Sequence, residues 1–158
     1  MQGVEELLRE HIKGDYPLVE ETSRHLVAAG GKRLRPALVL LSAGALGYRG
    51  NAHHTLAAVV EFIHTATLLH DDVVDESDLR RGRRTANAIF GNAASVLVGD
   101  YLYSRAFQLM VELERMRIMQ VMADTTNQIA EGVDYNIRWQ QKIGAYNFTA
   151  NAQVTYML

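Results

Sequence analysis

The residues best suited to chemistry form an acidic cluster at the end of an apolar run. Three carboxylates, Asp71, Asp72 and Asp75, close a largely apolar stretch at residues 59–70. Helical side chains three and four positions apart lie on one side, so these carboxylates converge. They also meet the negative end of the helix dipole and repel one another unless a cation bridges them. A cluster that offers only oxygen ligands favours a hard cation such as Mg²⁺, which binds through a few carboxylates together with substrate phosphates.

The alternative for this cluster is a solvated acidic helix end, but two basic clusters argue against it. Together they hold seven of the 16 lysines and arginines, namely Lys32, Arg33, Arg35, Arg80, Arg81, Arg83 and Arg84. Guanidinium groups bind phosphate oxygens bidentately and stay charged. If the fold brings both clusters near the aspartates, the site suits a diphosphate with a divalent metal. A solvated face or a nucleic-acid contact are the other interpretations, although nucleic-acid sites usually interleave aromatic residues.

A histidine and a glycine-rich segment extend this candidate site. At about 100° per residue, His64 shares a helical stripe with Asp71 and Asp75, so its ring could donate a hydrogen bond to a diphosphate. A core histidine bonded to a backbone carbonyl is the alternative. Residues 30–36 read Gly-Gly-Lys-Arg-Leu-Arg-Pro. There the glycines free the backbone, and Pro36 starts a helix whose N-terminus favours anions.

Helical periodicity dominates the chain and must position these groups. It predicts helices at residues 3–13, 18–29, 36–47, 52–76, 92–113 and 116–131. Pro17 and Pro36 suit helix starts, Gly47 suits a C-cap, and Asn51 and Asn92 suit N-caps. No strand is placed before residue 132.

Composition bounds the class of protein. A chain of 158 residues buries one core, and contents of 48% hydrophobic and 22% charged residues are typical of a globular domain. Without cysteine there is no disulfide or thiolate metal site, so we expect a reducing, cytoplasmic location. No apolar run is long enough to span a membrane. A net charge of −2 implies no bulk attraction to nucleic acid or membrane.

The character of the sequence changes after Gly132. Helical periodicity is lost there, and the rest is rich in Asn, Gln and aromatic residues, with a strand-like alternation at 146–158. We therefore divide the chain into an all-α helical region, residues 1–132, and a divergent tail, residues 133–158, that is expected to be irregular.

Four motifs, taken in order, resemble the trans-isoprenyl diphosphate synthases, also called polyprenyl synthetases. They lie at residues 30–36, 61–75, 80–82 and 91–100. The resemblance covers about residues 3–132 and implies the N-terminal half of an all-α, isoprenoid synthase-type helical bundle. The implied activity joins isopentenyl diphosphate to an allylic diphosphate, with farnesyl diphosphate as the expected primer. The allylic diphosphate ionises, the isopentenyl double bond attacks, and a proton is lost.

The same resemblance implies residue roles. Asp71, Asp72 and Asp75 match the first aspartate-rich motif, which is catalytic and holds Mg²⁺ against the allylic diphosphate, while Arg80 contacts that diphosphate. The pocket for isopentenyl diphosphate is matched by Lys32, Arg35, His64 and Arg81.

Two small residues bear on product length. In the family, bulky aromatic residues at the positions of Ala66 and Thr67 close the hydrocarbon pocket and give short products. Both residues are small here, which predicts a long-chain, octaprenyl-type product.

The resemblance also implies an incomplete site. The family's second aspartate-rich motif lies in a half that this sequence does not match, so a catalytically inactive relic or a regulatory subunit is the main alternative. A Mg²⁺-dependent diphosphate hydrolase of another fold has little support, because no general-base arrangement is apparent. Apolar helix faces left uncovered by the missing half predict a homo-oligomer, most simply the dimer typical of the family.

Overall fold

The described part of the chain is predominantly helical, as the sequence predicts. The computed structural model describes residues 1–13, 17–28, 32–130, 135–143 and 146–154. Its helices are α1 (Gln2–Ile12), α2 (Pro17–Ala28), α3 (Leu34–Ala45), α4 (Ala52–Val74), α5 (Ala86–Phe90), α6 (Asn92–Glu112) and α7 (Met116–Ala130). Over the described residues, none of these helices is long and apolar enough to cross a membrane.

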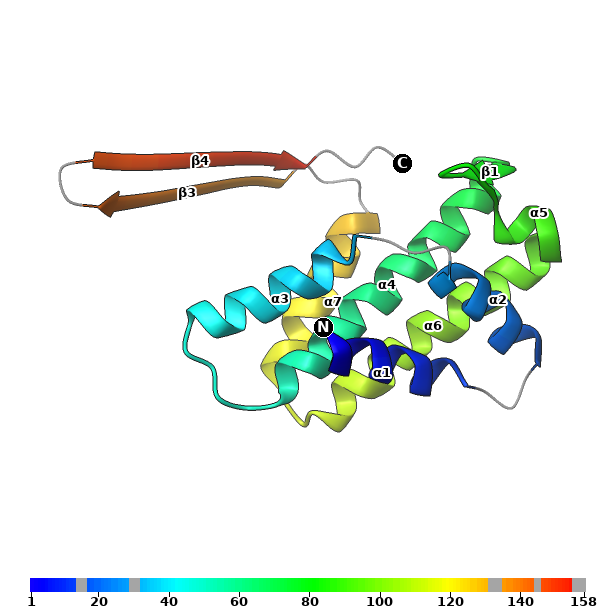
Figure 1. The fold of residues 1–158 in the computed structure, drawn as a ribbon, viewed down its shortest axis with the longest axis horizontal. Coiled ribbons are helices and arrows are strands. Elements are labelled where there is room, and N and C mark those ends of the chain that lie inside the picture. Colours follow the sequence, from blue (N-terminus) through cyan, green and yellow to red (C-terminus); the bar gives the residue numbers. More distant parts are fainter. Residues whose placement is uncertain (14–16, 29–31, 131–134, 144–145, 155–158) are drawn as a thin grey trace. The chain divides into compact units, whose positions relative to one another are not determined.

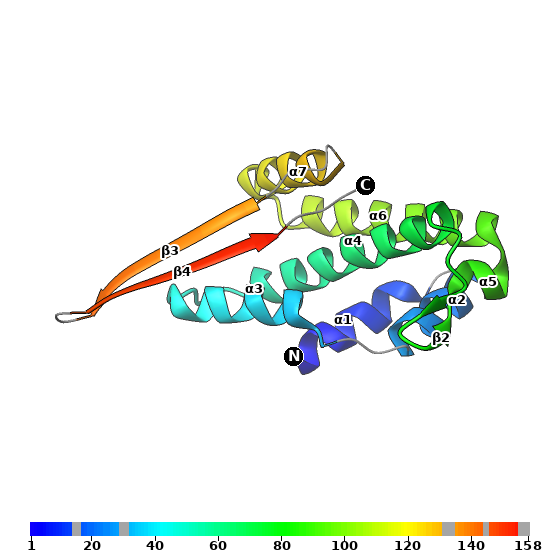
Figure 2. The same cartoon turned by 90° about the horizontal axis from the view of Figure 1, so that it is seen from above.

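The core of the first unit is the packing of α4 against α6. The two helices run side by side, and α1 and α3 also contact α4 (Figures 1 and 2). Phe62 of α4 and Leu102 of α6 are almost completely buried. Gly99 of α6 lets the helices approach closely, because a Cβ atom there would lie 2.3 Å from Nε2 of His70. Any larger residue would force the two helices or the His70 ring to move.

Helix α1 is amphipathic and covers one side of this core. Val4, Leu8 and Ile12 recur every four residues and are buried. Each such side chain contributes roughly 1.5–3 kcal/mol by leaving water. The neighbouring Glu5 is only partly exposed and reaches towards the segment before α3.

Gly47 ends α3 as predicted. Its φ of +69° is in the left-handed region that glycine adopts without steric cost. The Gly47 N–H donates to the Gly44 carbonyl at 3.1 Å, and the Tyr48 N–H donates to the Ala43 carbonyl at 2.9 Å. This pair of bonds is the Schellman arrangement, which satisfies carbonyls left open at a helix end.

The start of α6 differs from the prediction. Gly91 is the N-cap, and Asn92 is already the first helical residue, so the N-cap predicted at Asn92 is wrong. Gly91 has a φ of +87°, which glycine tolerates and asparagine tolerates less well. The short helix α5 just before it was not predicted, because five residues carry too little periodicity. Asn51 does precede α4 as predicted, but its side chain makes no capping hydrogen bond.

A small hairpin follows α4, where no strand was expected. Strands β1 (Leu79–Arg80) and β2 (Arg83–Arg84) are antiparallel, with Arg80 opposite Arg83. Arg81 and Gly82 form the turn with φ angles of +53° and +77°. Two consecutive positive φ angles characterise the primed turns that suit the twist of a hairpin. The arginine-rich loop is therefore an ordered element.

The chain divides into two compact units, Met1–Arg115 and Met116–Leu158. This division precedes α7, whereas the sequence-based boundary was placed after Gly132. Within the second unit, β3 (Tyr135–Ile143) pairs antiparallel with β4 (Tyr146–Val154). The tail expected to be irregular thus contains a hairpin, in line with its alternating pattern.

Candidate functional site

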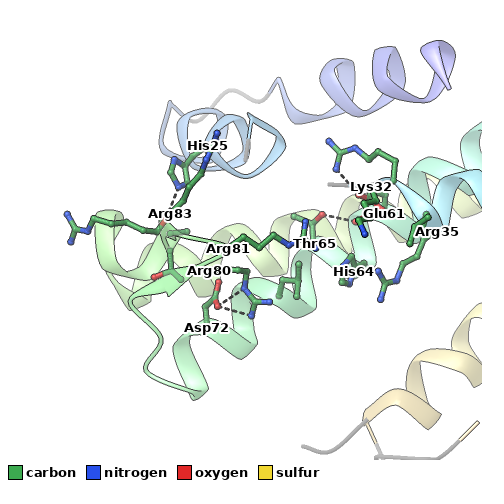
Figure 3. Close-up of a pocket in the computed structure, with 16 residues that line it drawn as sticks. His25, Lys32, Arg35, Glu61, His64, Thr65, Asp72, Arg80, Arg81 and Arg83 are labelled. Atoms are coloured by element: carbon green, nitrogen blue, oxygen red, sulfur yellow. Dashed lines mark hydrogen bonds and ion pairs between the residues drawn. The ribbon is translucent and has the colours of Figure 1, made fainter. Parts of the chain in front are cut away.

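Both basic clusters line one cavity in the first unit. The cavity has a volume of about 510 Å³ and is bordered on one side by α4 (Figure 3). Every lysine and arginine of the two sequence clusters lines it: Lys32, Arg33, Arg35, Arg80, Arg81, Arg83 and Arg84. The other charged lining groups are two carboxylates, Glu61 and Asp72. The resulting excess of positive charge favours a multiply charged anion.

The cavity gathers most, but not all, of the predicted site residues. It is lined by Asp72, Arg80, Lys32, Arg35, His64 and Arg81, and Asp71, Asp75, Ala66 and Thr67 lie outside its lining. Helical phase accounts for Ala66, Thr67 and Asp71, whereas Asp75 is the C-cap residue, just beyond the last turn of α4. Asp72 lies about 80° round α4 from His64, whereas Asp71 lies about 20° on the opposite side. The cavity is centred on the face that carries Glu61, Leu68 and Asp72.

Asp72 joins α4 to the hairpin. Its side chain is only 3% exposed, and its Oδ1 atom accepts hydrogen bonds from Nε and Nη2 of Arg80, both at 2.8 Å. Two charge-assisted bonds from arginine stabilise a buried carboxylate that desolvation would otherwise penalise. The bond also orients Arg80 along the cavity wall (Figure 3).

Hydrogen bonds to the carbonyls of Asp72 and Ser77 hold the segments flanking the hairpin close to the end of α4. The Ser77 N–H donates to the Asp72 carbonyl at 2.9 Å, and Asn87 Nδ2 donates to the Asp72 and Ser77 carbonyls at 3.2 Å each. Thr85 Oγ1 also donates to the Ser77 carbonyl at 2.6 Å. The bonds to Asp72 satisfy a carbonyl in the last turn of α4, where intrahelical partners are lacking, and the bonds to Ser77 hold the segment that follows the helix. Sequence analysis did not identify Asn87 or Thr85, since neither belongs to a charged motif.

The acidic cluster is less assembled than its sequence suggests. Burial raises the pKa of Asp71, and the nearby Asp75 and Asp72 carboxylates raise it further, whereas Arg80 and His70 oppose the shift. Over the residues described, no group of three His, Asp or Glu side chains is close enough to hold a metal ion. The donors still fit Mg²⁺ as a partial set, because this ion commonly uses one or two carboxylates and completes its shell with water and substrate phosphates.

His64 is held neutral by its surroundings. Burial lowers its pKa to about 4, and the charges of Arg35, Arg80 and Arg81 act in the same direction. A neutral imidazole keeps one N–H donor at neutral pH. Because His64 lines the cavity and is only half-buried, the alternative of a core histidine does not apply.

A buried ion-pair network beside the cavity escaped sequence analysis. Arg33 donates from Nε to Oε1 of Glu5 at 2.9 Å and from Nη1 to Oε1 of Glu61 at 2.7 Å. One signal was available: Glu61 is a charged residue inside an apolar helical run, and buried charges require partners.

Ala66 and Thr67, the residues connected with product length, have different environments. Ala66 is completely buried, whereas Thr67 is half-buried and its hydroxyl donates to the His64 carbonyl at 2.8 Å. Neither residue borders the cavity that the two basic clusters line.

Comparison with known proteins now gives the family. A model of the family described as Polyprenyl synthetase matches residues 16–156. The chain belongs to the polyprenyl synthetase family. It is 57% identical over 132 residues to octaprenyl diphosphate synthase of Escherichia coli, which covers 84% of this chain and 41% of that protein. The chain thus spans about two fifths of the length of the curated relatives it matches.

Solved polyprenyl synthetase structures share the fold. A decaprenyl diphosphate synthase from Rhodobacter capsulatus has a TM-score of 0.81 at 56% identity, covering 84% of this chain and 41% of that one. A polyprenyl synthase from Caulobacter crescentus, complexed with calcium and isoprenyl diphosphate, has a TM-score of 0.81 at 50% identity over 84% and 40% of the two chains. The all-α, isoprenoid synthase-type fold predicted from the sequence is confirmed.

Proposed function

We propose that this chain carries the N-terminal half of a prenyltransferase site, which joins isopentenyl diphosphate to an allylic diphosphate and makes a long-chain, octaprenyl-type product. One observation carries this proposal: both basic clusters, His64 and Asp72 line a single cavity of about 510 Å³. The identity of 57% to an octaprenyl diphosphate synthase supports the substrate class.

The cationic wall is proposed to bind isopentenyl diphosphate. Lys32, Arg35, His64 and Arg81 all line the cavity. Charged donors bind phosphate oxygens more strongly than neutral ones, and the neutral His64 adds one N–H donor without further charge. Such a wall can hold a diphosphate without a metal ion and can orient the isopentenyl group.

The acidic end of α4 is proposed to serve the allylic diphosphate, with farnesyl diphosphate as the primer. Asp71, Asp72 and Asp75 would hold Mg²⁺, which when bound neutralises charge on the departing diphosphate. Arg80, which pairs with Asp72, is proposed to contact the same group. In the reaction the carbon–oxygen bond to the diphosphate breaks, the isopentenyl double bond forms the new carbon–carbon bond, and a proton leaves the adduct.

Turnover tests the proposal directly. The purified 158-residue chain is incubated with isopentenyl diphosphate, farnesyl diphosphate and Mg²⁺, and products are sized by chromatography. Long products that disappear in Asp71→Ala support it. Absence of product from a sample with normal helical circular dichroism favours the second candidate, a non-catalytic relic or regulatory subunit.

Product length has its own test. Ala66→Phe would place a ring in a fully buried position, where overpacking typically costs about 1–3 kcal/mol, so its stability must be measured alongside its products. Thr67→Phe, at a half-buried position, is the gentler variant. Shorter products from either active variant would support a tunnel passing these residues.

We also propose that the chain forms a homodimer and is located in the cytoplasm. Leu34, Leu38 and Leu41 lie every three or four residues along α3 and are exposed, forming an apolar stripe of the kind that oligomers cover. Sedimentation equilibrium distinguishes a dimer from a monomer, and Leu38→Lys should weaken association if the stripe is part of the contact.

A further inference from the structure

Glu61 has an unusual position for a carboxylate. It is the only Asp, Glu, Lys or Arg between Val59 and Leu69, and it is only 8% exposed. A buried carboxylate is strongly disfavoured unless an opposite charge and hydrogen bonds compensate it. Here the compensation comes from Arg33, whose Nη1 lies 2.7 Å from Glu61 Oε1.

Arg33 connects three elements through its side chain. Besides Glu61 of α4, it bonds Glu5 of α1 at 2.9 Å, and its own side chain is 17% exposed. Each glutamate is 28 positions away from Arg33 in the sequence. The guanidinium thus ties the segment that enters α3 to two packed helices.

The backbone of Arg33 adopts a conformation that surrounding contacts must stabilise. Its φ of +46° and ψ of +36° are left-handed, a conformation that is sterically unfavourable for a residue with a Cβ atom. Such conformations persist where the surrounding contacts impose them. The side-chain network supplies these contacts at the point where the chain turns from Lys32 into α3.

We propose that Glu61 is a positioning residue for diphosphate binding, acting through Arg33 to hold Lys32 and Arg35 at the cavity wall. This inference rests on the proposed function of that wall. Lys32 is adjacent to Arg33 in the chain, and Arg35 is in the first turn of α3, which begins at Leu34. Both cations line the same cavity as Glu61 (Figure 3). Cations held in place before binding lose less conformational entropy when the anion arrives.

Neutralising Glu61 should change the affinity for an anion in opposite directions, depending on whether Glu61 acts by its charge alone or by positioning Lys32 and Arg35. Glu61 borders a cavity that attracts anions, so removing its negative charge should tighten anion binding if charge were its only contribution. It should also tighten binding if Arg33 were a direct ligand, because Glu61 would then compete with the anion. A positioning role predicts weaker binding when Glu61 is neutralised.

The test is calorimetric titration of inorganic pyrophosphate into the full chain, without divalent metal and at low salt. Glu61→Gln should weaken binding by about fivefold, within the range of measured couplings between contacting residues. Glu20→Gln is the matched control, because it removes an exposed i,i+4 pair with Arg24 away from the cavity. Unchanged or tighter binding by Glu61→Gln overturns the inference.

A double-mutant cycle with Arg33 separates a positioning role of Glu61 from a general loss of structure. In an Arg33→Gln background, Glu61→Gln should cause no further weakening, and an additive loss overturns a role through Arg33. If Glu61→Gln loses its helical circular dichroism, the more exposed Glu5→Gln carries the test, with an expected weakening of about twofold. Unchanged or tighter binding by that variant overturns the inference. Absence of pyrophosphate binding by the wild-type chain overturns the proposed function, and the inference with it.

Discussion

The cationic wall and the acidic end of α4 differ in how they are assembled. The wall draws cations from residues 32–35, at the start of α3, and from the β1–β2 hairpin, which are far apart in sequence and meet at one cavity. The acidic residues Asp71, Asp72 and Asp75 are neighbours in sequence, yet only Asp72 lines that cavity. Proximity along the chain therefore did not produce a gathered site, whereas tertiary packing did.

The two regions also differ in how their charges are balanced. Arg33 is balanced by Glu5 and Glu61, and Arg80 by Asp72, so the wall can collect cations without leaving all of them mutually repelling. Asp71 has no comparable relief: burial and the neighbouring carboxylates raise its pKa despite Arg80 and His70. Charge is thus partly balanced within the wall, whereas repulsion between carboxylates persists at the acidic end.

The largest effect on binding is expected from substitutions at the acidic end of α4, and it should depend on Mg²⁺, unlike binding by the wall. Asp71→Ala should lower Mg²⁺-dependent affinity for farnesyl diphosphate by at least about a hundredfold, if it removes a metal donor as proposed. Asp72→Ala should do the same and also lower the unfolding temperature, because it breaks the pair with Arg80. Calorimetric titration and thermal unfolding measure both effects. Asp78→Ala, at an exposed position beyond α4, is the control, and an equal loss there would contradict the assignment.

The second effect concerns the wall. Arg35→Ala should weaken metal-free pyrophosphate binding by about tenfold, the contribution of a charge-assisted contact. Asp71→Ala should not weaken it, because that residue lies outside the cavity lining. Arg24→Ala, an exposed arginine on α2, controls for lost net charge. The contrast fails if pyrophosphate binds only when Mg²⁺ is present.

The third effect is the titration of His64. Nuclear magnetic resonance of labelled histidines should give a pKa of about 4 in the free chain, and pyrophosphate should raise it by offsetting the nearby arginines. In the unfolded chain the same group protonates near 6.5. The stability that neutral His64 contributes is therefore complete above that pH and is lost as pH falls towards 4. His64→Gln identifies the signal, and a pKa unaffected by pyrophosphate would place His64 away from the anion.

The smallest effect is the response of stability to metal. Because the pKa of Asp71 is raised in the folded chain, its contribution is most favourable at low pH and is lost as pH rises through that pKa. Mg²⁺ with pyrophosphate should offset this loss, raising the unfolding temperature by about 2–4 °C at pH 7 and by less at pH 4. Scanning calorimetry measures it. In Asp71→Asn the rise in unfolding temperature should differ less between pH 7 and pH 4. An unaltered difference would contradict the role given to Asp71.

Local signals made most of the helices predictable. Apolar periodicity and end signals such as Gly47 act within a few residues, so the expected helices agree closely with α1–α4, α6 and α7. Helix α5 and the β1–β2 hairpin were missed because each is too short to establish a period. The hairpin depends on two positive φ angles at Arg81 and Gly82, for which a single glycine is a weak signal.

The sequence by itself determined which groups could bind a diphosphate, because cation and carboxylate chemistry is a property of residue type. It also determined most of the helices that carry them. Only the tertiary structure decided which groups share a cavity: Asp72 faces it with the arginines, and Asp71 lies to one side. It also turned Arg33 towards Glu5 and Glu61, each 28 positions away, since such pairing exists only once α1 and α4 have packed together.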